Sequence, residues 1–174
     1  MIISRRGFLR ALAASPLLLT FKKAFAFKRN ERILRMSNVH TQEQIRIKYC
    51  DACGYDYAAL ERINYFLRCH YTDEVKTMDI RVIDVLCDIK NTIDEEKEVT
   101  IISGYRSKAY NDLLLRQGRG VSPNSFHLRG LAIDFTIEGV SNEEISRIAR
   151  SLASGGVGEY SEFVHIDVGP VRYW

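Results

Sequence analysis

Two kinds of hydrophobic spacing organise the first half of the chain. Apolar and polar residues alternate on both sides of a polar turn at Thr41–Gln44, which predicts a β-hairpin over residues 33–49. Apolar residues then recur at helical spacing over residues 60–67 and 80–89. This spacing predicts two amphipathic helices after the hairpin.

Shorter elements are predicted in the second half. The hydrophobic pattern predicts strands over residues 99–103, 131–137 and 163–168. It predicts helices over residues 107–117 and 142–153, and Ser107 can cap the first of them. Glycines and Pro123 mark residues 118–126 as a loop. Because strands and helices are interspersed, we expect an α+β fold, with helices packed on a small antiparallel sheet.

Composition restricts the class of protein. A chain of 174 residues forms one compact domain, which we place at residues 27–174. A hydrophobic share of 46% and a charged share of 27% exclude a disordered chain and a membrane bundle. Residues 1–26 hold five of the 25 basic residues and none of the 22 acidic ones, so the net charge of +3 comes from this segment. The domain itself has no basic excess, and we expect no nucleic-acid partner.

The first 26 residues have the order of a secretory signal. A basic start is followed by an apolar stretch over residues 11–21 and by small residues at Ala24 and Ala26. The apolar stretch is too short to span a membrane. The sequence SRRGFLR at residues 4–10 resembles the twin-arginine export motif. We therefore expect export to the periplasm by the twin-arginine machinery, with cleavage after Ala26; an uncleaved anchor is the alternative.

Four cysteines, Cys50, Cys53, Cys69 and Cys87, would enter an oxidising compartment after export. Cys50 and Cys53 have C-x-x-C spacing, but no second pair of metal ligands follows them at zinc-site spacing. A structural disulfide is the preferred interpretation, with Cys69 and Cys87 on neighbouring helices as one pairing among several.

Two histidines and one aspartate are candidates for a metal site. His127 and Asp134 are separated by six residues, and we expect His127 to open the strand that carries Asp134. Alternation in that strand places Ile133, Phe135 and Ile137 on a core face and Asp134 on the opposite face. His165 has the same placement in the last strand. Three protein ligands with a fourth position open to water are the arrangement of catalytic zinc.

Four segments resemble the YcbK-type murein endopeptidases of the M15 and D-Ala-D-Ala peptidase-like group. They are SGYRS at residues 103–107, SFHLRGLAIDF at 125–135, GGVGEY at 155–160 and FVHIDVGPVRYW at 163–174. The resemblance implies a Hedgehog/DD-peptidase-like fold and one zinc ion per chain, held by His127, Asp134 and His165. It also implies peptidoglycan as substrate, with cleavage of a cross-link between D-centres or between two meso-diaminopimelate residues. The cysteines are not part of the family pattern.

Three further residues are candidates for catalysis. Asp167 shares a strand face with His165 and is the first choice for the general base, although it could instead orient an imidazole. Glu162, three residues before His165, is the other candidate base. Arg106 follows a strand in a turn and is the expected cation for a substrate carboxylate or the tetrahedral oxyanion.

Three other functions compete with a zinc-dependent endopeptidase that acts as a monomer. The first is a D,D-carboxypeptidase that trims stem peptides, and the second a zinc-stabilised wall-binding module without turnover. The third is a thiol oxidoreductase based on Cys50 and Cys53. Digestion of defined muropeptides separates the first two from an endopeptidase, and chelation separates the third.

Overall fold

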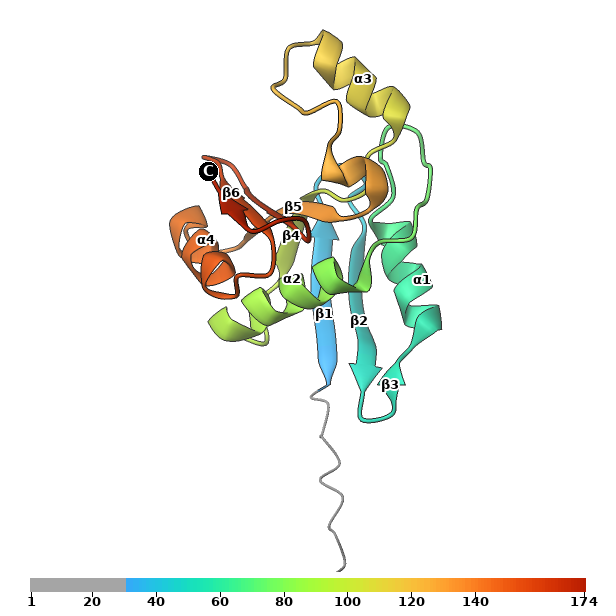
Figure 1. Ribbon diagram of the computed structural model, residues 1–174. Helices are drawn as coiled ribbons and strands as arrows, with labels where there is room; N and C mark the ends of the chain where they lie inside the picture. The colour runs from blue at the N-terminus through green and yellow to red at the C-terminus, as the bar shows by residue number, and fades with distance from the viewer. Residues whose placement is uncertain (1–30) are drawn as a thin grey trace, which may run out of the picture.

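The computed structural model describes residues 31–174, which form helices packed on one mixed sheet (Figure 1). The predicted leader, with its twin-arginine motif and cleavage site, lies outside the described residues. In chain order the elements are β1 (Arg32–Asn38), β2 (Gln44–Asp51), β3 (Gly54–Tyr55), α1 (Tyr57–Phe66), α2 (Ile80–Ile93), β4 (Val99–Ser103), α3 (Lys108–Arg116), the short 3-10 helix η1 (Phe126–Arg129), β5 (Ala132–Ile137), α4 (Asn142–Ser151), β6 (Gly156–Glu159), β7 (Val164–Asp167) and β8 (Arg172–Tyr173).

The strands of the described chain form one sheet in the order β3-β2-β1-β4-β5-β7-β6-β8. All neighbours are antiparallel except β1–β4 and β6–β8, which are parallel. The predicted hairpin is present as β1 and β2, and the prediction of a single α+β domain is confirmed. The sheet is larger and less uniformly antiparallel than expected. Strands β3, β6 and β8 have only two to four residues, too few for a pattern of alternation to reveal them.

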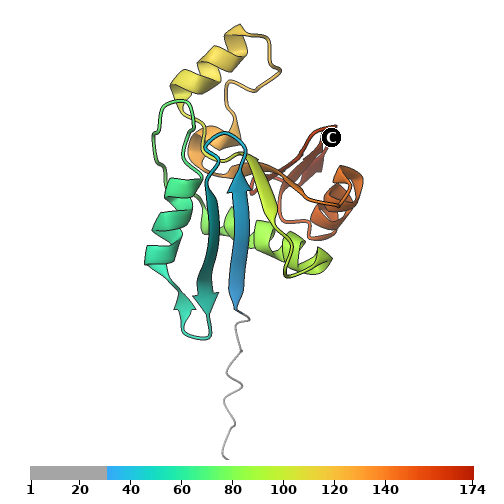
Figure 2. The same cartoon turned by 180° about the vertical axis from the view of Figure 1, so that it is seen from behind.

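Helices α1, α2 and α4 cover one face of the sheet, whereas Figure 2 shows β1, β2 and β4 with no helix in front of them. The covered face holds the hydrophobic core. The predicted core face of β5 is confirmed, since Ile133, Phe135 and Ile137 are at most 1% exposed. Each fully buried side chain of this kind contributes about 1.5–3 kcal/mol. The core therefore fixes β5, the strand that carries Asp134, at the centre of the sheet.

Each α-helix within residues 31–174 begins at a polar cap residue, and Ser107 caps α3 as predicted. Each cap side chain accepts a hydrogen bond from a backbone N–H in the first turn of its helix. The cap residues are Asp56 for α1, Asp79 for α2, Ser107 for α3 and Ser141 for α4. Helix α3 leads away from the sheet, and the chain returns through a loop to η1 (Figure 1). Residues 119–122, 124 and 125 of this loop lie near Asp134 of β5 and His165 of β7.

The predicted disulfide is wrong, because all four cysteines are free. Cys69 lies after the end of α1 rather than in a helix, and its Sγ is 3.4 Å from the Ser107 hydroxyl oxygen. Cys87 lies on α2 with its thiol directed at the Ile33 carbonyl oxygen. The two thiols thus contact different parts of the fold. Spacing along the chain did not reveal this.

No helix within residues 31–174 combines the length and the apolar character that crossing a membrane requires.

Candidate metal centre and active site

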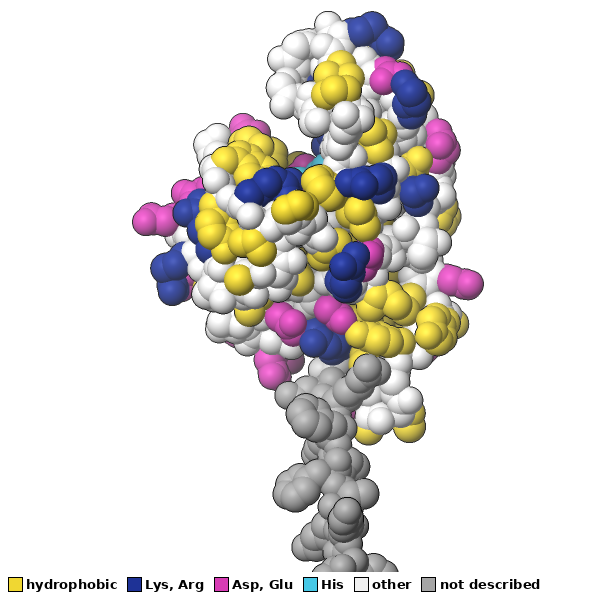
Figure 3. All heavy atoms as spheres, viewed as in Figure 1, with side chains coloured by type: hydrophobic (Ala, Val, Ile, Leu, Met, Phe, Trp, Pro, Cys, Tyr) yellow, Lys and Arg dark blue, Asp and Glu magenta, His cyan; other side chains and the backbone are white. Residues whose placement is uncertain are grey.

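A pocket opens between the loop that follows α3 and the C-terminal strands. Its volume is about 460 Å³. Figure 3 shows a notch between the projecting α3 region and the C-terminal part of the molecule, with a histidine at its floor and Lys or Arg side chains beside it. The pocket is lined by Arg106, Arg119, Gly120, Val121, Ser122, Asn124, Ser125, Phe126, His127, Asp134, Tyr160, Phe163, His165, Arg172 and Trp174.

Asp134 and His165 are direct neighbours across the sheet. Strands β5 and β7 are antiparallel, and their register pairs these two residues. Opposite residues in a sheet project from the same face, so both side chains point away from the core into the pocket. The Asp134 Oδ1 lies 2.7 Å from the His165 Nδ1.

His127 reaches the same point from outside the sheet. It was expected to open a strand, but it lies in η1, and β5 begins only at Ala132. Gly130 ends η1 with φ of +68°, a left-handed conformation that glycine adopts without strain, and the chain then turns into β5. A Cβ at this position would also lie 2.7 Å from the Thr77 carbonyl oxygen. The turn brings the His127 Nε2 to 3.2 Å from the Asp134 Oδ2.

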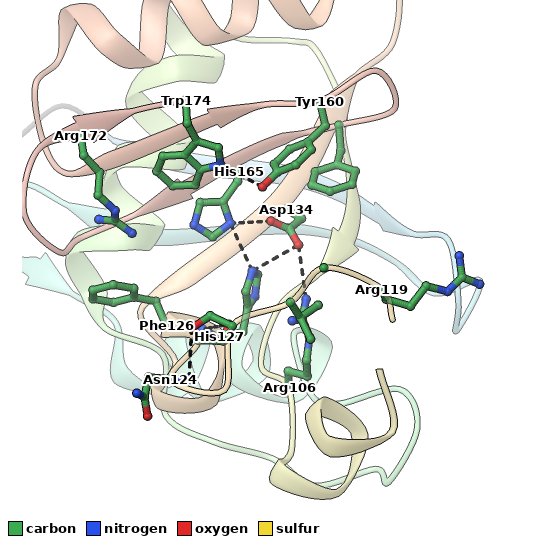
Figure 4. A pocket seen from close by; sticks show the side chains of 15 residues that line it. Arg106, Arg119, Asn124, Phe126, His127, Asp134, Tyr160, His165, Arg172 and Trp174 are labelled. Atoms are coloured by element: carbon green, nitrogen blue, oxygen red, sulfur yellow. Dashed lines mark hydrogen bonds and ion pairs between the residues drawn. The ribbon is translucent and has the colours of Figure 1, made fainter. Parts of the chain in front are cut away.

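The three side chains could hold a metal ion, since one ligand atom from each lies within 4.8 Å of the others. The His127 Nε2 is 3.3 Å from the His165 Nδ1 (Figure 4). Ligand atoms about 2.1 Å from a tetrahedral zinc ion are separated by roughly 3.4 Å, so the spacing fits. Two imidazoles and one carboxylate are also ligands that zinc commonly takes.

Hydrogen bonds on the far side of each imidazole leave the inner nitrogen available. The His127 Nδ1 lies 2.7 Å from the Gly104 carbonyl oxygen, which can only accept, so Nδ1 carries the proton there. The His165 Nε2 lies 3.1 Å from the Asp167 Oδ2. Partners of this kind set the tautomer of metal-binding histidines. In both rings the nitrogen that faces the centre is therefore the one that can bind a cation.

The charges of the site also suit a cation. Burial would raise the pKa of Asp134, but the charges and hydrogen bonds of His127 and His165 hold it below its usual range. Burial lowers the pKa of His127, although the charge of Asp134 opposes this shift. Burial would also lower the pKa of His165, but hydrogen bonds to Asp134 and Asp167 raise it to about 9. The ionised Asp134 therefore favours positive charge at the centre, which is either a proton on His165 or a cation that displaces this proton.

Asp167 is buried behind His165 and does not line the pocket. Its Oδ1 accepts from the backbone N–H groups of Gly156 and Gly169, and its Oδ2 is 2.6 Å from the Arg172 Nη2. Burial would raise the pKa of Asp167, but His165, Arg172 and the Gly169 N–H hold it well below its usual range. Both oxygens are occupied, so the carboxylate is placed to orient the His165 ring.

Arg106 lies in the pocket with unused hydrogen-bonding capacity. The residue is 8% exposed. Its Nη atoms lie 3.4 Å from the Asn111 Oδ1 and 3.6 Å from the Asp134 Oδ2, both beyond ordinary hydrogen-bond length. Its Nε has no hydrogen-bond partner among the described residues. A guanidinium with spare donors beside the metal ligands can bind an anionic group.

Glu162 is the one predicted site residue that the structure does not bring to the centre. It is exposed on the connection between β6 and β7, and it does not line the pocket. The prediction that Glu162 takes a proton stays a prediction.

Several residues of the site were not predicted. Arg172 contacts Asp167, the buried Asn111 lies beside Arg106, and Tyr160 and Trp174 form a wall of the pocket. A polar residue one turn after the Ser107 cap is the only local signal that could have pointed to Asn111. The other three come from segments too short and irregular to show which way their side chains point.

Comparisons with known proteins identify relatives of this chain. The family model Peptidase_M15_2, described as peptidoglycan L,D-endopeptidase MepK, matches residues 26–174. The chain is 41% identical over 145 residues to peptidoglycan L,D-endopeptidase MepK of Escherichia coli K12, covering 82% of this chain and 80% of the relative. It is 39% identical over 146 residues to a probable peptidoglycan L,D-endopeptidase MepK of Haemophilus influenzae, covering 82% and 78%. No solved structure gives a significant match. The chain therefore belongs to the Peptidase_M15_2 family and is a peptidoglycan endopeptidase of the M15 peptidase group.

Proposed function

We propose that this peptidoglycan endopeptidase is zinc-dependent and cleaves L,D-cross-links, those between two meso-diaminopimelate residues. The observation that carries the zinc proposal is the convergence of two imidazole nitrogens and a carboxylate in an open pocket. The cross-link is proposed because the names of the Escherichia coli and Haemophilus influenzae relatives specify L,D-endopeptidase.

One zinc ion per chain would be held by the His127 Nε2, an Asp134 carboxylate oxygen and the His165 Nδ1. When bound, zinc polarises the scissile carbonyl as a Lewis acid and lowers the pKa of the attacking water toward about 7. The Gly104 carbonyl and the Asp167 carboxylate keep the two rings in the required tautomer and orientation. Asp167 is thus proposed as a positioning residue rather than the base.

Arg106 is proposed to bind the oxyanion that develops on the scissile carbonyl. Its guanidinium lies beside Asp134 and lines the pocket, and its weakly engaged Nη groups can donate hydrogen bonds to an anion there. Arg119 and Arg172 also line the pocket. Three cations around one cleft fit a stem peptide that carries free carboxylates.

A peptidoglycan endopeptidase acts in the periplasm or outside the cell, where its substrate lies. The periplasm is the proposed location, and the twin-arginine pathway is proposed as the route on the strength of the SRRGFLR motif. The protein is proposed to act as a monomer, with peptidoglycan as its partner.

Digestion of defined muropeptides tests the function directly. The zinc-loaded protein is expected to convert dimers joined by a meso-diaminopimelate–meso-diaminopimelate bond into monomers. D-Ala–meso-diaminopimelate dimers and uncross-linked pentapeptides should remain intact. A chelator should stop the reaction, and added zinc should restore it. Loss of terminal D-Ala alone would favour a carboxypeptidase, and cleavage that survives complete metal removal would overturn the zinc proposal.

The two carboxylates predicted as general base are separated by a pair of amide variants. Asp167→Asn is expected to weaken zinc binding about 10–100-fold, because the amide no longer holds His165 as a carboxylate does. Glu162→Gln is expected to leave zinc content and kcat/KM within about threefold, as for other exposed positions. Metal titration and steady-state kinetics measure both. A loss of about 10²–10⁴ in kcat for Glu162→Gln would instead assign the proton transfer to Glu162.

A further inference from the structure

The wall of the pocket formed by the C-terminal strands presents a tyrosine hydroxyl to the centre. Tyr160 follows β6 and lines the pocket, with 43% of its surface exposed. Its ring stacks on Phe163, with ring centroids 4.6 Å apart and planes 28° apart. In Figure 4 the Tyr160 hydroxyl lies on the side of the ring that faces Asp134 and His165.

The contact with Trp174 restricts where this hydroxyl can donate its proton. The Trp174 Nε1 donates a hydrogen bond to the Tyr160 Oη over 2.9 Å, and an indole nitrogen can only donate. The Tyr160 oxygen is therefore an acceptor in this contact, and its own O–H must donate elsewhere. Within residues 31–174 that O–H has no protein acceptor. The Tyr160 O–H is therefore available to donate a hydrogen bond to a group bound in the pocket.

Trp174 is held firmly enough to keep the hydroxyl in place. Its backbone N–H donates to the Val157 carbonyl, and its backbone oxygen accepts from the Glu159 N–H. Its ring lies against Gly158, where a Cβ would come within 2.6 Å of the indole. The Arg172 guanidinium covers the same ring, 4.9 Å from its centroid. A donor fixed before substrate binds loses little free energy in reorganisation.

Tyr160 and Arg106 approach the centre from opposite sides. In Figure 4 the two side chains lie on either side of the Asp134–His165 pair. Arg106 comes from the turn between β4 and α3, and Tyr160 from the connection between β6 and β7. A carbonyl oxygen placed beside the three ligand residues would thus meet a charged donor on one side and a neutral donor on the other.

We propose that Tyr160 is a catalytic residue whose hydroxyl donates a hydrogen bond to the scissile carbonyl oxygen as it becomes an oxyanion, and that Trp174 is a positioning residue that directs this proton. The proposal rests on the proposed endopeptidase site. The bond strengthens as negative charge grows on the oxygen, so it acts on the transition state more than on bound substrate.

The test compares Tyr160→Phe with Trp174→Phe in the zinc-loaded full chain. Loss of one oxyanion donor is expected to lower kcat about 10²-fold for Tyr160→Phe, with KM and zinc content nearly unchanged. Binding of a phosphinic analogue of the cross-link, measured by calorimetry, is expected to weaken by a similar factor. Binding of an uncleavable ground-state peptide should not change. This contrast is one that a purely structural role would not produce.

Trp174→Phe keeps a ring but removes the indole N–H, so kcat should fall by less than in Tyr160→Phe. The double variant should be no slower than Tyr160→Phe alone, because Trp174 acts through the hydroxyl. Tyr173→Phe is the matched control. Tyr173 lies on strand β8, its hydroxyl donates to the Arg150 carbonyl of helix α4, and it does not line the pocket, so its removal should leave kinetics unchanged.

Wild-type kinetics for Tyr160→Phe, or additive losses in the double variant, would overturn the proposal. Equal weakening of the phosphinic analogue and the ground-state peptide would also overturn it, because it would assign Tyr160 to substrate binding alone. A wild-type protein that failed to bind zinc or to cleave any cross-link would refute the proposed function instead. The two failures are therefore distinguishable.

Discussion

Alanine in place of His165 is expected to remove both the bound zinc and cross-link cleavage. His165 supplies one of three proposed ligands, and its partner Asp134 is 95% buried at the same point. Two remaining ligands hold zinc too weakly for it to survive dialysis. The metal contributes several kcal/mol to transition-state stabilisation, so activity should fall at least about 10³-fold.

Metal analysis after dialysis, together with muropeptide digestion, measures this outcome. The fold should survive, because Asp167 keeps its contacts with Arg172 and two backbone N–H groups. His40→Ala is the matched control, since His40 is exposed and stacks on His70 away from the pocket. A His165→Ala protein with stoichiometric zinc and normal cleavage would contradict the proposed metal centre.

The second large effect is expected at Arg106. Arg106→Ala should lower kcat about 10²–10³-fold, the usual result of removing an oxyanion donor, while zinc content stays at one ion per chain. Arg106→Lys should recover only part of this loss, because an ammonium group keeps the charge but not the planar fork of donors. Steady-state kinetics separates the two roles predicted for this cation. A fall in kcat indicates the oxyanion, whereas a rise in KM alone would indicate a substrate carboxylate.

Arg116→Ala serves as the control for charge. Arg116 is exposed at the end of α3 and does not line the pocket, so its loss changes the net charge equally and should leave kcat unchanged. The thermal unfolding midpoint of each Arg106 variant should also be measured, because Arg106 is buried beside Asp134 and Asn111 and its replacement could affect stability. A folded, zinc-loaded Arg106→Ala protein with wild-type kcat would refute the oxyanion role.

Local pattern was sufficient to predict most of the regular elements. The alternation of β5 placed Ile133 and Phe135 in the core and Asp134 on the opposite face, as the structure has them. That inference works because the side-chain period of a strand is two residues, whatever surrounds it. The pairing of Asp134 with His165 needed one more fact, the register between β5 and β7, which depends on contacts between segments distant in sequence.

Where the backbone is irregular, the position of a side chain depends on tertiary contacts and could not be predicted from local sequence. His127 was expected in a strand, but a left-handed Gly130 packed against Thr77 ends a 3-10 helix at that point. The prediction of a disulfide was wrong for a related reason, since Cys69 contacts Ser107 and Cys87 contacts Ile33, and both partners are distant in sequence. No local pattern encodes such partners.

By itself the sequence determined the α+β class, the candidate ligands and, through family resemblance, the reaction. Only the tertiary structure decided which nitrogen of each histidine faces the centre, that Asp167 lies behind His165 rather than in the pocket, and that Tyr160 and Trp174 share a hydrogen bond at its wall. The physical reason is that hydrogen bonds and burial depend on atoms brought together by the whole fold, whereas residue type and spacing act along the chain.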